Sequence, residues 1–468
     1  MEKEGKEWKA QVIVFPFPVQ GHINPMLQFS KRLFSKGLKV TLATTHFLLN
    51  HSTFQTQTQT TVTVEPISDG FDKGGMAEAA SVEAYNDRFK AVGSETLFEL
   101  IKKQRIPVKC LVYDSTLPWA LDVAKKLGIA GASFFTQSCA VNSIYYHVKH
   151  GLLSLPVPGP TVSIDGLPLL QINDLPSFVS DLESYPSLLP IMLIQFSNLE
   201  EADFILFNTF DKLEDQVLNW MVKQWPIKTI GPTVPSMYSD KRIEGDTDYG
   251  FNLFKPSEDS IMNWLNNRET GSVIYVSFGT IAELKKEQME ELAFGLKESN
   301  YHFLWVVRES ENKKLPNGFA EEIAEKGFMV PWCPQLEVLA HGAVGCFMTH
   351  CGWNSTIESL SLGVPVVAVP QWIDQTTNAK LTADVWEVGV RAGVDEKGIA
   401  RREEIERCTR EVMEGERGIE IRRNAMKWKE LAKEAVDEDG SSDRNIKEFV
   451  DRLLCSRIDS SRPDSIGN

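Results

Sequence analysis

Two series of apolar runs, each alternating with amphipathic helical patterns, restrict the fold of this chain more than any other feature. The runs are nearly continuous in apolar residues, as expected of strands that are buried on both faces. Strands that alternate with helices in this way predict parallel sheets covered by helices on both sides. The first series comprises VIVFPFP (12–18), KVTLAT (39–44), KCLVYD (109–114) and ASFF (132–135), and the second comprises SVIYVSFG (272–279), HFLWVVR (302–308), GCFMTH (345–350) and VPVVAVP (364–370).

The helices between and after these strands carry recognisable ends. Pro25 suits the first position of a helix, and Gly37 suits its end. A second helix is expected over 118–128. Two charged amphipathic helices are expected within 401–435, and a final helix over 443–454.

A polar segment separates the two series and divides the chain. Residues 233–260 are rich in Pro, Ser, Asp and Lys and show little periodicity, which is typical of a linker. A chain of 468 residues also exceeds what one hydrophobic core usually holds. We therefore predict two doubly wound, Rossmann-like α/β domains that face each other across a cleft. The predicted parts are an N-terminal domain (1–235), a linker (236–258), a C-terminal domain (259–440), a C-terminal helix (441–455) and a polar tail (456–468).

Charge and cysteine content exclude several classes of partner. The net charge of −15 argues against nucleic acid and against anionic membrane surfaces. The seven cysteines are odd in number and form no CxxC pair, so we expect reduced thiols and neither a zinc site nor a disulfide framework. The charged first residues contain no apolar signal core, and no later run reaches the ~18 apolar residues of a membrane span. These observations predict a cytoplasmic protein without a membrane span.

Segment 345–362 is the most informative part of the sequence. A buried strand ends at His350, Gly352 permits a tight turn, and a helix opens near Asn354 and Ser355. Unpaired N–H groups and the positive dipole end make a helix N-terminus a cradle for phosphate. A plainer interpretation is that Asn354 or Ser355 is an ordinary N-cap on a strand–helix turn. This segment alone leaves both interpretations open.

A longer window around this segment carries a family resemblance. Residues 332–375 read WCPQLEVLAHGAVGCFMTHCGWNSTIESLSLGVPVVAVPQWIDQ, which resembles the donor-binding signature of plant secondary-product UDP-sugar glycosyltransferases nearly residue for residue. The resemblance extends over essentially the whole chain, including FPFPVQGHINPM, YDSTLPWALDVAKKLGI and VSFGT. It implies the GT-B fold, with an acceptor-binding N-terminal domain, a UDP-sugar-binding C-terminal domain and a last helix that crosses back to the first domain.

The resemblance also implies which residues hold the UDP-sugar donor. Trp332 offers a flat π surface to the uracil ring, with Cys333 and Gln335 beside it, and Glu358 accepts from both ribose hydroxyls. The diphosphate is assigned to Thr280, His350, Gly352, Trp353, Asn354 and Ser355, where Trp353 contributes backbone N–H groups. The sugar end is assigned to Trp372, Asp374 and Gln375, and a Gln as the last signature residue suits glucose.

The family's catalytic dyad matches two residues of the first domain. His22 follows the first strand in a loop, and Asp114 ends the strand KCLVYD at the same sheet edge. In the family mechanism His22 is the general base, and Asp114 fixes its tautomer and stabilises the imidazolium. The family pattern has a hydroxyl residue in many members where this chain has Val19, which makes a donor contact at that position doubtful. Thr136 is expected to supply a compensating hydroxyl near the sugar.

The acceptor pocket is expected in the N-terminal domain and is predicted to be largely apolar and aromatic. Its candidates are Phe17, Tyr85, Phe89, Cys139, Asn142, Tyr146, Phe178, Met192 and Phe196. The expected activity is an inverting, metal-independent transfer of glucose from UDP-glucose, the co-substrate, to a hydroxyl of a steroid, terpenoid or phenolic such as a flavonoid. The expected enzyme is a monomer.

Other functions remain as alternatives at this point. The subgroup that the chain resembles includes enzymes for salicylate and thiohydroximates, so ester or S-glucoside formation is one alternative. A non-catalytic nucleotide-sugar-binding protein is another, although the intact dyad argues against it. No GxGxxG follows a strand and no GxxxxGK[ST] occurs, which excludes a nicotinamide dehydrogenase and a P-loop enzyme. Asp246-Thr247-Asp248 matches a metal-binding DxD only superficially and is interpreted as a solvated linker.

Overall fold

The apolar runs of the first series pair into a seven-stranded sheet. The computed structural model describes Trp8 and residues 10–54, 62–252 and 258–455; the predicted tail at 456–468 lies outside the described residues. All neighbouring strands of this sheet are parallel. Their order is β10 (Ile227–Thr229), β9 (Phe204–Phe207), β6 (Ala130–Phe135), β5 (Val108–Asp114), β1 (Gln11–Phe15), β2 (Lys39–Thr45) and β4 (Thr63–Ile67).

The second series forms a six-stranded sheet, also parallel throughout. Its order is β14 (Gly327–Val330), β13 (His302–Val306), β12 (Val273–Ser277), β15 (Val344–Thr349), β16 (Val366–Ala368) and β17 (Gly389–Arg391). In each sheet the earlier strands lie on one side of the first strand and the later strands lie on its other side. This reversal falls between β1 and β5 in the first sheet and between β12 and β15 in the second. Open α/β sheets bind ligands at the carboxyl ends of the strands beside such a reversal.

Helices cover both faces of each sheet, and neighbouring residues of one strand point into different cores. In β1, Val12 and Val14 pack with α1 (Gln20–Ser35), whereas Ile13 and Phe15 pack with α3 (Val82–Lys102) and α4 (Trp119–Lys126). The remaining longer helices of the first domain are α2 (His46–His51), α5 (Cys139–Lys149), α7 (Leu188–Ile194) and α8 (Asp215–Met221), with the short α6 (Ser177–Ser180). The second domain contains α9 (Glu258–Asn266), α10 (Lys286–Ser299), α11 (Phe319–Glu322), α12 (Gln335–Ala340), α13 (Trp353–Leu362), α14 (Gln375–Lys380) and α15 (Arg402–Met413).

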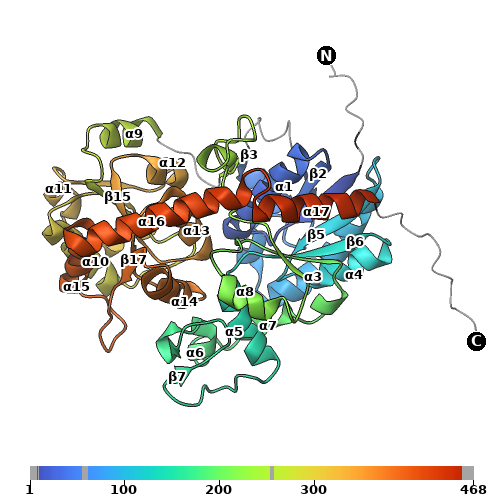
Figure 1. Ribbon diagram of the computed structural model, residues 1–468, viewed down its shortest axis with the longest axis horizontal. Coiled ribbons are helices and arrows are strands. Elements are labelled where there is room, and N and C mark those ends of the chain that lie inside the picture. Colours follow the sequence, from blue (N-terminus) through green and yellow to red (C-terminus); the bar gives the residue numbers. More distant parts are fainter. Residues whose placement is uncertain (1–7, 9, 55–61, 253–257, 456–468) are drawn as a thin grey trace, which may run out of the picture.

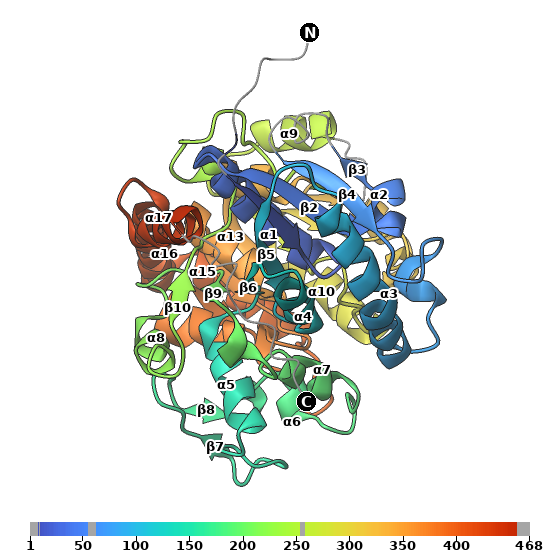
Figure 2. The ribbon, with the colours of Figure 1, turned by 90° about the vertical axis from the view of Figure 1, so that its right-hand side faces the viewer.

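The last two helices connect the domains. Figure 1 shows α16 (Gly415–Val436) and α17 (Ser441–Cys455) running one after the other along the length of the molecule. Phe449 of α17 packs against Phe29 and Phe204, inside the core of the N-terminal domain. The chain therefore crosses back to the domain where it began, as the rotated view also shows (Figure 2). In the described part of the chain, none of the helices has both the length and the apolar character needed to cross a bilayer.

Several predicted elements have different ends in the structure, and two of these differences concern the first strand and helix. The strand predicted over 12–18 is β1 and stops at Phe15, since Pro16 and Pro18 cannot donate to the sheet ladder. The helix predicted to start at Pro25 already begins at Gln20, so the prediction that His22 lies in a loop is wrong. Pro25 lies inside α1, where its missing N–H leaves the carbonyl of residue 21 without its usual helical partner.

Candidate active site

A cavity of about 330 Å³ lies where the two domains face each other. The N-terminal domain lines it with residues that follow β1 and β6, including Val19, His22 and Thr136. The C-terminal domain lines it with residues that follow β12 and β15, including Thr280 and His350. Both contributions come from the carboxyl ends of strands beside the two reversals, so the fold itself creates the site.

The turn from β15 into α13 presents a helix N-terminus to this cavity. Gly352 occupies the N-cap position and no side chain caps the helix, so the interpretation of Asn354 or Ser355 as an ordinary N-cap is wrong. The uncapped first-turn N–H groups can receive an anion. Cys351 takes a positive φ of 62°, which turns the chain sharply between strand and helix. This geometry favours the phosphate-cradle interpretation.

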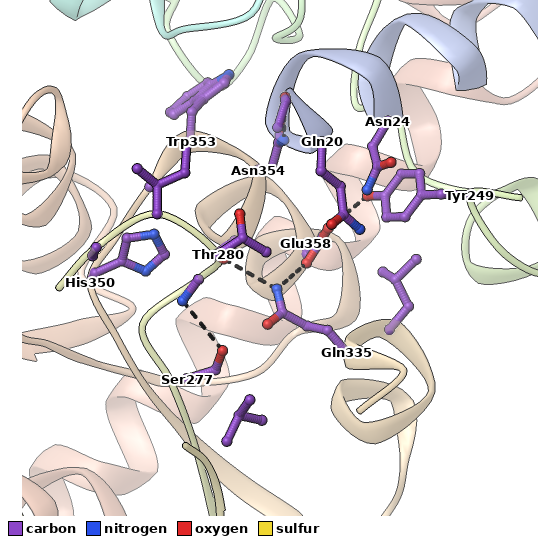
Figure 3. Close-up of a pocket in the computed structure, with 18 of the residues that line it drawn as sticks. Gln20, Asn24, Tyr249, Ser277, Thr280, Gln335, His350, Trp353, Asn354 and Glu358 are labelled. Carbon is purple, nitrogen blue, oxygen red and sulfur yellow. Dashed lines mark hydrogen bonds between the residues drawn. The ribbon is translucent and has the colours of Figure 1, made fainter. Parts of the chain in front are cut away.

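His350 lies in this turn as a neutral group. Burial lowers the pKa of its imidazole to about 4, so the ring is uncharged near neutral pH. Two glycines make room for it, because a Cβ added at Gly279 or Gly352 would lie 2.8 or 2.7 Å from His350 Nε2. A neutral imidazole can donate one hydrogen bond to a phosphate oxygen without adding a charge. Thr280, which follows β12, lies on the same cavity wall (Figure 3).

Asn354 ties this cradle to the N-terminal domain. Its side-chain Nδ2 donates a hydrogen bond of 2.7 Å to the backbone carbonyl of Gly21. This carbonyl is the one that Pro25 leaves without a helical donor in α1. A proline inside the helix thus creates the acceptor that fixes Asn354 across the interface.

The end of the cavity that is predicted to bind the nucleoside is a connected polar network around Glu358. Gln335 Nε2 donates to Glu358 Oε2 at 2.6 Å and lies 3.1 Å from Ser355 Oγ, while Tyr275 donates to Gln335 Oε1. Burial raises the pKa of the Glu358 carboxyl, and its two hydrogen bonds act in the opposite direction. Figure 3 shows Gln335 and Glu358 pointing toward each other across this end of the cavity. The half-buried Trp332 lines the same end, as a stacking surface requires.

His22 and Asp114 form a close pair on the opposite wall. His22 Nδ1 lies 2.6 Å from Asp114 Oδ2, and 26% of the His22 side chain is exposed whereas Asp114 is fully buried. Burial by itself lowers the pKa of His22, but the Asp114 carboxylate outweighs it and raises that pKa above its ordinary value. Asp114 also accepts from the backbone and side chain of Thr116 and from the backbone N–H of Phe17. With Nδ1 engaged, Nε2 is the ring nitrogen that can accept a proton.

The sugar end lies between the two walls. Burial raises the pKa of Asp374 to about 6, and its carboxylate accepts from Asn378 Nδ2 at 2.8 Å. Gln375 Oε1 accepts from the backbone N–H groups of Gln371 and Trp372, which leaves its amide nitrogen to donate to a sugar hydroxyl. Ile373 takes a positive φ of 57°, a strained conformation for a β-branched residue.

Three of the residues predicted to bind the donor have side chains that already contact a partner within the protein. The indole of Trp353 is buried and donates to the carbonyl of Asn208, so only its backbone can meet a phosphate. The Cys333 thiol lies 3.1 Å from the Tyr275 hydroxyl, and burial raises its pKa to about 12. Thr136 places its hydroxyl 3.3 Å from His22 Nδ1, beside the base.

The predicted acceptor residues do not line this cavity. Among the described lining residues, none of the nine candidates occurs. Tyr85 and Phe89 are buried in the core beneath β1, where the Tyr85 hydroxyl donates to Asp69. Six of the other candidates lie around α5 and α7: Cys139, Asn142, Phe178 and Phe196 are buried, and Tyr146 and Met192 are half-buried. The last candidate, Phe17, is half-buried and packs near the His22 ring. Apolar composition does not distinguish a pocket from a core, which explains this outcome.

Several lining residues were missed by the sequence reasoning. Gln20 and Asn24 lie one helical turn apart on α1, and their side-chain oxygens are buried without a hydrogen-bond partner in the described structure. Their spacing of four residues was a usable signal, but it has meaning only once 20–24 is recognised as helical. Tyr249 and Gln137 also line the cavity.

The prediction of a solvated Asp246-Thr247-Asp248 is wrong for its first residue. Asp246 is buried and pairs with Lys31 Nζ at 2.7 Å, while its second oxygen accepts from the backbone N–H of Ser236. Both carboxylate oxygens therefore have partners within the protein. Among the residues that the structure describes, no cluster of His, Cys, Asp or Glu has an arrangement that fits a metal ion.

Known proteins resemble this chain over nearly its whole length. A family model described as UDP-glucoronosyl and UDP-glucosyl transferase matches residues 211–436, and one described as glycosyltransferase, N-terminal domain, matches residues 9–68. Mogroside I-E synthase of Siraitia grosvenorii is 52% identical over 446 residues, which cover 94% of this chain and 98% of that protein. Flavonol 7-O-β-glucosyltransferase of Arabidopsis thaliana is 48% identical, with coverages of 96% and 100%. The crystal structure of Os79 from O. sativa in complex with UDP superposes with a TM-score of 0.88 at 43% identity, covering 95% of this chain and 100% of that one.

Proposed function

Because this chain belongs to the plant UDP-glycosyltransferases, we propose that it is an inverting O-glucosyltransferase that transfers glucose from UDP-glucose to a hydroxyl of a small lipophilic metabolite. The predicted family and the predicted GT-B fold are confirmed by relatives and solved structures that match over nearly the full length. One observation carries the more detailed proposal: a polarised histidine and an uncapped helix N-terminus line the same cavity from opposite domains.

The chemistry follows from that placement. His22 Nε2 accepts the proton of the acceptor hydroxyl, while Nδ1–H remains bonded to Asp114. The acceptor oxygen forms a bond to the anomeric carbon as the bond between that carbon and the β-phosphate oxygen breaks. The electron pair of the broken bond stays on UDP. Attack from the face opposite UDP inverts the anomeric configuration.

The C-terminal wall stabilises the leaving group. Negative charge that develops on UDP faces the first turn of α13, the side chains of Asn354 and Ser355, and the neutral His350. We propose that these groups suffice without a metal ion. Glu358 and Gln335 hold the ribose, and Asp374 and Gln375 hold the glucose.

The acceptor class is proposed from the relatives. One relative is named for mogroside synthesis, another for a flavonol, and a structure of Os79 contains a trichothecene. We propose a steroid, terpenoid or phenolic acceptor, and an enzyme that acts as a monomer in the cytoplasm. Ester formation on a carboxylate such as salicylate, S-glucoside formation on a thiohydroximate, and mere binding of a nucleotide sugar are the competing outcomes of the test.

An acceptor screen tests the proposal directly. Purified enzyme is incubated with excess UDP-glucose and a steroid, a triterpenoid, a flavonol, salicylate or a thiohydroximate, and the products are read by mass for an added hexose. We expect a hexose on at least one of the first three, formed on the order of 10²–10⁴-fold more slowly by the His22→Ala variant. Product on salicylate or the thiohydroximate alone would overturn the proposed acceptor class, and UDP binding without any product would support the non-catalytic alternative.

A further inference from the structure

The linker between the domains supplies a tyrosine to the nucleoside end of the site. Tyr249 donates its hydroxyl hydrogen to Glu358 Oε1 at 2.7 Å, while Gln335 donates to the other oxygen, Oε2. Figure 3 shows Tyr249 reaching Glu358 from the side opposite Gln335. The carboxylate that faces the ribose is therefore held from both sides, once by the C-terminal domain and once by the linker.

Packing and ion pairs fix the segment that carries Tyr249. Tyr249 and Tyr238 both pack against the apolar cluster beneath α12. On the other side, Lys31 of α1 pairs with Asp246 and donates to the backbone carbonyl of Asp248, the residue next to Tyr249. The side chains of Lys31 and Asp246 are only 8% and 2% exposed, so this pair is a buried anchor.

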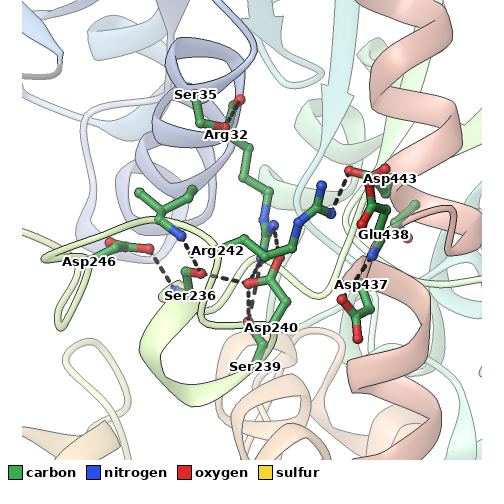
Figure 4. Close-up of polar contacts among 12 residues, drawn as sticks. Arg32, Ser35, Ser236, Ser239, Asp240, Arg242, Asp246, Asp437, Glu438 and Asp443 are labelled. Carbon is green, nitrogen blue, oxygen red and sulfur yellow. Dashed lines mark hydrogen bonds and ion pairs between the residues drawn. The ribbon is translucent and has the colours of Figure 1, made fainter.

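A second set of contacts anchors the start of the same segment. Arg32 of α1 donates to both oxygens of Asp240, and Ser236 donates to Asp240 as well. Arg242 pairs with Asp443 at the beginning of α17. Figure 4 shows these contacts joining the linker to α1 and to the C-terminal helix. The linker is thus clamped to the N-terminal domain while its tyrosine reaches into the donor site of the other domain.

We propose that Tyr249 is a positioning residue for UDP-sugar binding, which orients the Glu358 carboxylate toward the two ribose hydroxyls. The inference rests on the proposed function, since it assigns Glu358 to the ribose. Each carboxylate oxygen can accept two hydrogen bonds. Tyr249 and Gln335 use one position on each oxygen, which leaves one position on each for a ribose hydroxyl.

Electrostatics favours the same role. Burial raises the pKa of Glu358 toward the protonated form, which would be a poorer acceptor, and the hydrogen bond from Tyr249 lowers it. Burial and the adjacent carboxylate raise the pKa of Tyr249 well above its ordinary value, so Tyr249 keeps its proton and donates. The linker segment that contains Asp246 and Tyr249 therefore acts on the bound nucleotide through the hydrogen bond from Tyr249 to Glu358.

Calorimetric titration with UDP alone tests the inference without requiring turnover. Tyr249→Phe keeps the packed ring and removes only the hydroxyl, and we expect UDP to bind about tenfold more weakly. Tyr301→Phe is the matched control, because it also removes a tyrosine hydroxyl that donates to a carboxylate, that of Glu414, but at a residue that does not line the cavity. In turnover, Tyr249→Phe should raise the KM for UDP-glucose and leave kcat and the acceptor KM nearly unchanged.

A pH series separates this role from a merely loosened linker. Without the hydroxyl the pKa of Glu358 rises further above its ordinary value, so the ratio of the variant's Kd to the wild-type Kd should grow as the pH is lowered toward that pKa. A loosened linker would give the same ratio at each pH. In a Glu358→Gln background, Tyr249→Phe should have little effect, because the charged partner is gone.

The outcomes distinguish this inference from the proposed function. Equal UDP affinity in Tyr249→Phe and Tyr301→Phe, or a ratio that does not change with pH, would overturn the role of Tyr249 alone. Wild-type protein that does not bind UDP would overturn the proposed function, and the inference with it.

Discussion

The two walls of the cavity are built by different means. On the C-terminal wall, the polar groups are already paired with one another, as in the contacts of Gln335 with Ser355 and Glu358. On the N-terminal wall, His22 and Asp114 form one ion pair, while Gln20 and Asn24 reach toward the Glu358 end of the cavity with side-chain oxygens that have no partner among the described residues (Figure 3). The C-terminal wall, which we assign to the nucleotide sugar, is thus prearranged by hydrogen bonds among its own residues, whereas the N-terminal wall contributes the pair that we assign to the base. Substitutions in the C-terminal wall should therefore change donor binding, and those around the dyad should change the chemical step.

The largest expected effect is on the chemical step. His22→Ala removes the base but none of the groups assigned to UDP, so kcat should fall on the order of 10²–10⁴-fold. The Kd for UDP should remain within about twofold of the wild-type value. His51→Ala, on the exposed end of α2, is the control and should leave kcat unchanged. A parallel loss of UDP affinity in His22→Ala would contradict the assignment of UDP binding to the C-terminal wall and of the chemical step to the N-terminal wall.

A second prediction tests whether the buried aromatics are core or pocket. Phe89 is fully buried against Phe15, Tyr85 and Trp119. Phe89→Ala should lower the free energy of unfolding by about 3–5 kcal/mol, measured by chemical denaturation. The acceptor KM should stay unchanged at temperatures where the variant is folded. Leu152→Ala, at a residue that is 63% exposed, should change stability by less than about 0.5 kcal/mol. An altered acceptor KM with normal stability would place Phe89 in the acceptor site.

The contrast between the walls also explains which parts of the site can be predicted from the sequence. Residues 350, 352, 354, 355 and 358 come from one turn and one helix, so their spacing along the chain fixes their spacing in space. The acceptor candidates come from separate elements of the first domain. Whether such an aromatic faces a cavity or a core depends on tertiary packing, which neither composition nor helical periodicity specifies.

The fold was predictable for a similar reason. Buried parallel strands are recognisable as continuous apolar runs, and those at 39–44 and 109–114 match β2 and β5 to within one residue at each end. The start of α1 was predicted too late because a proline usually marks the first turn of a helix. Here Pro25 lies inside the helix, and the backbone carbonyl that it leaves without a helical donor accepts a hydrogen bond from Asn354, 329 positions away. Asp246 was misjudged likewise, because its partner Lys31 belongs to another domain. Long-range partners of this kind leave no local pattern.

A third prediction concerns the strength of donor binding. Glu358→Ala removes the carboxylate assigned to the ribose, and the KM for UDP-glucose should rise about 10–100-fold, as expected for hydrogen bonds to a charged group. The acceptor KM should not change. Glu358→Gln preserves the shape and separates charge from size. An effect confined to the acceptor KM would contradict the assignment and would blur the distinction between the walls.

The pH dependence should show one titrating group on each wall: His22, which affects kcat, and Asp374, which affects the KM for UDP-glucose. His22 must be neutral to act as a base, and because its pKa is raised above 6.5, kcat should fall about tenfold per pH unit below that raised pKa. Asp374 has a pKa of about 6, so the KM for UDP-glucose should rise as the pH falls through 6 and the carboxylate loses its charge. Asp374→Asn should abolish the change in KM and leave the change in kcat. Loss of both pH effects in that single variant would show that the titrations are not separate.

The smallest effect is expected from metal chelation, which tests whether the C-terminal wall can neutralise the diphosphate by itself. In the proposed donor site, the leaving group faces the N-terminus of α13 and the side chains of Asn354 and Ser355, which offer hydrogen-bond donors and a positive dipole end. Initial rates with excess EDTA should therefore equal those without it, and added Mg²⁺ should not accelerate the reaction. Strong inhibition by EDTA that Mg²⁺ reverses would mean that the C-terminal wall cannot neutralise the diphosphate without a metal ion. The preformed network around Glu358 would then fix only the nucleoside, and the phosphates would depend on an ion that the protein has to recruit.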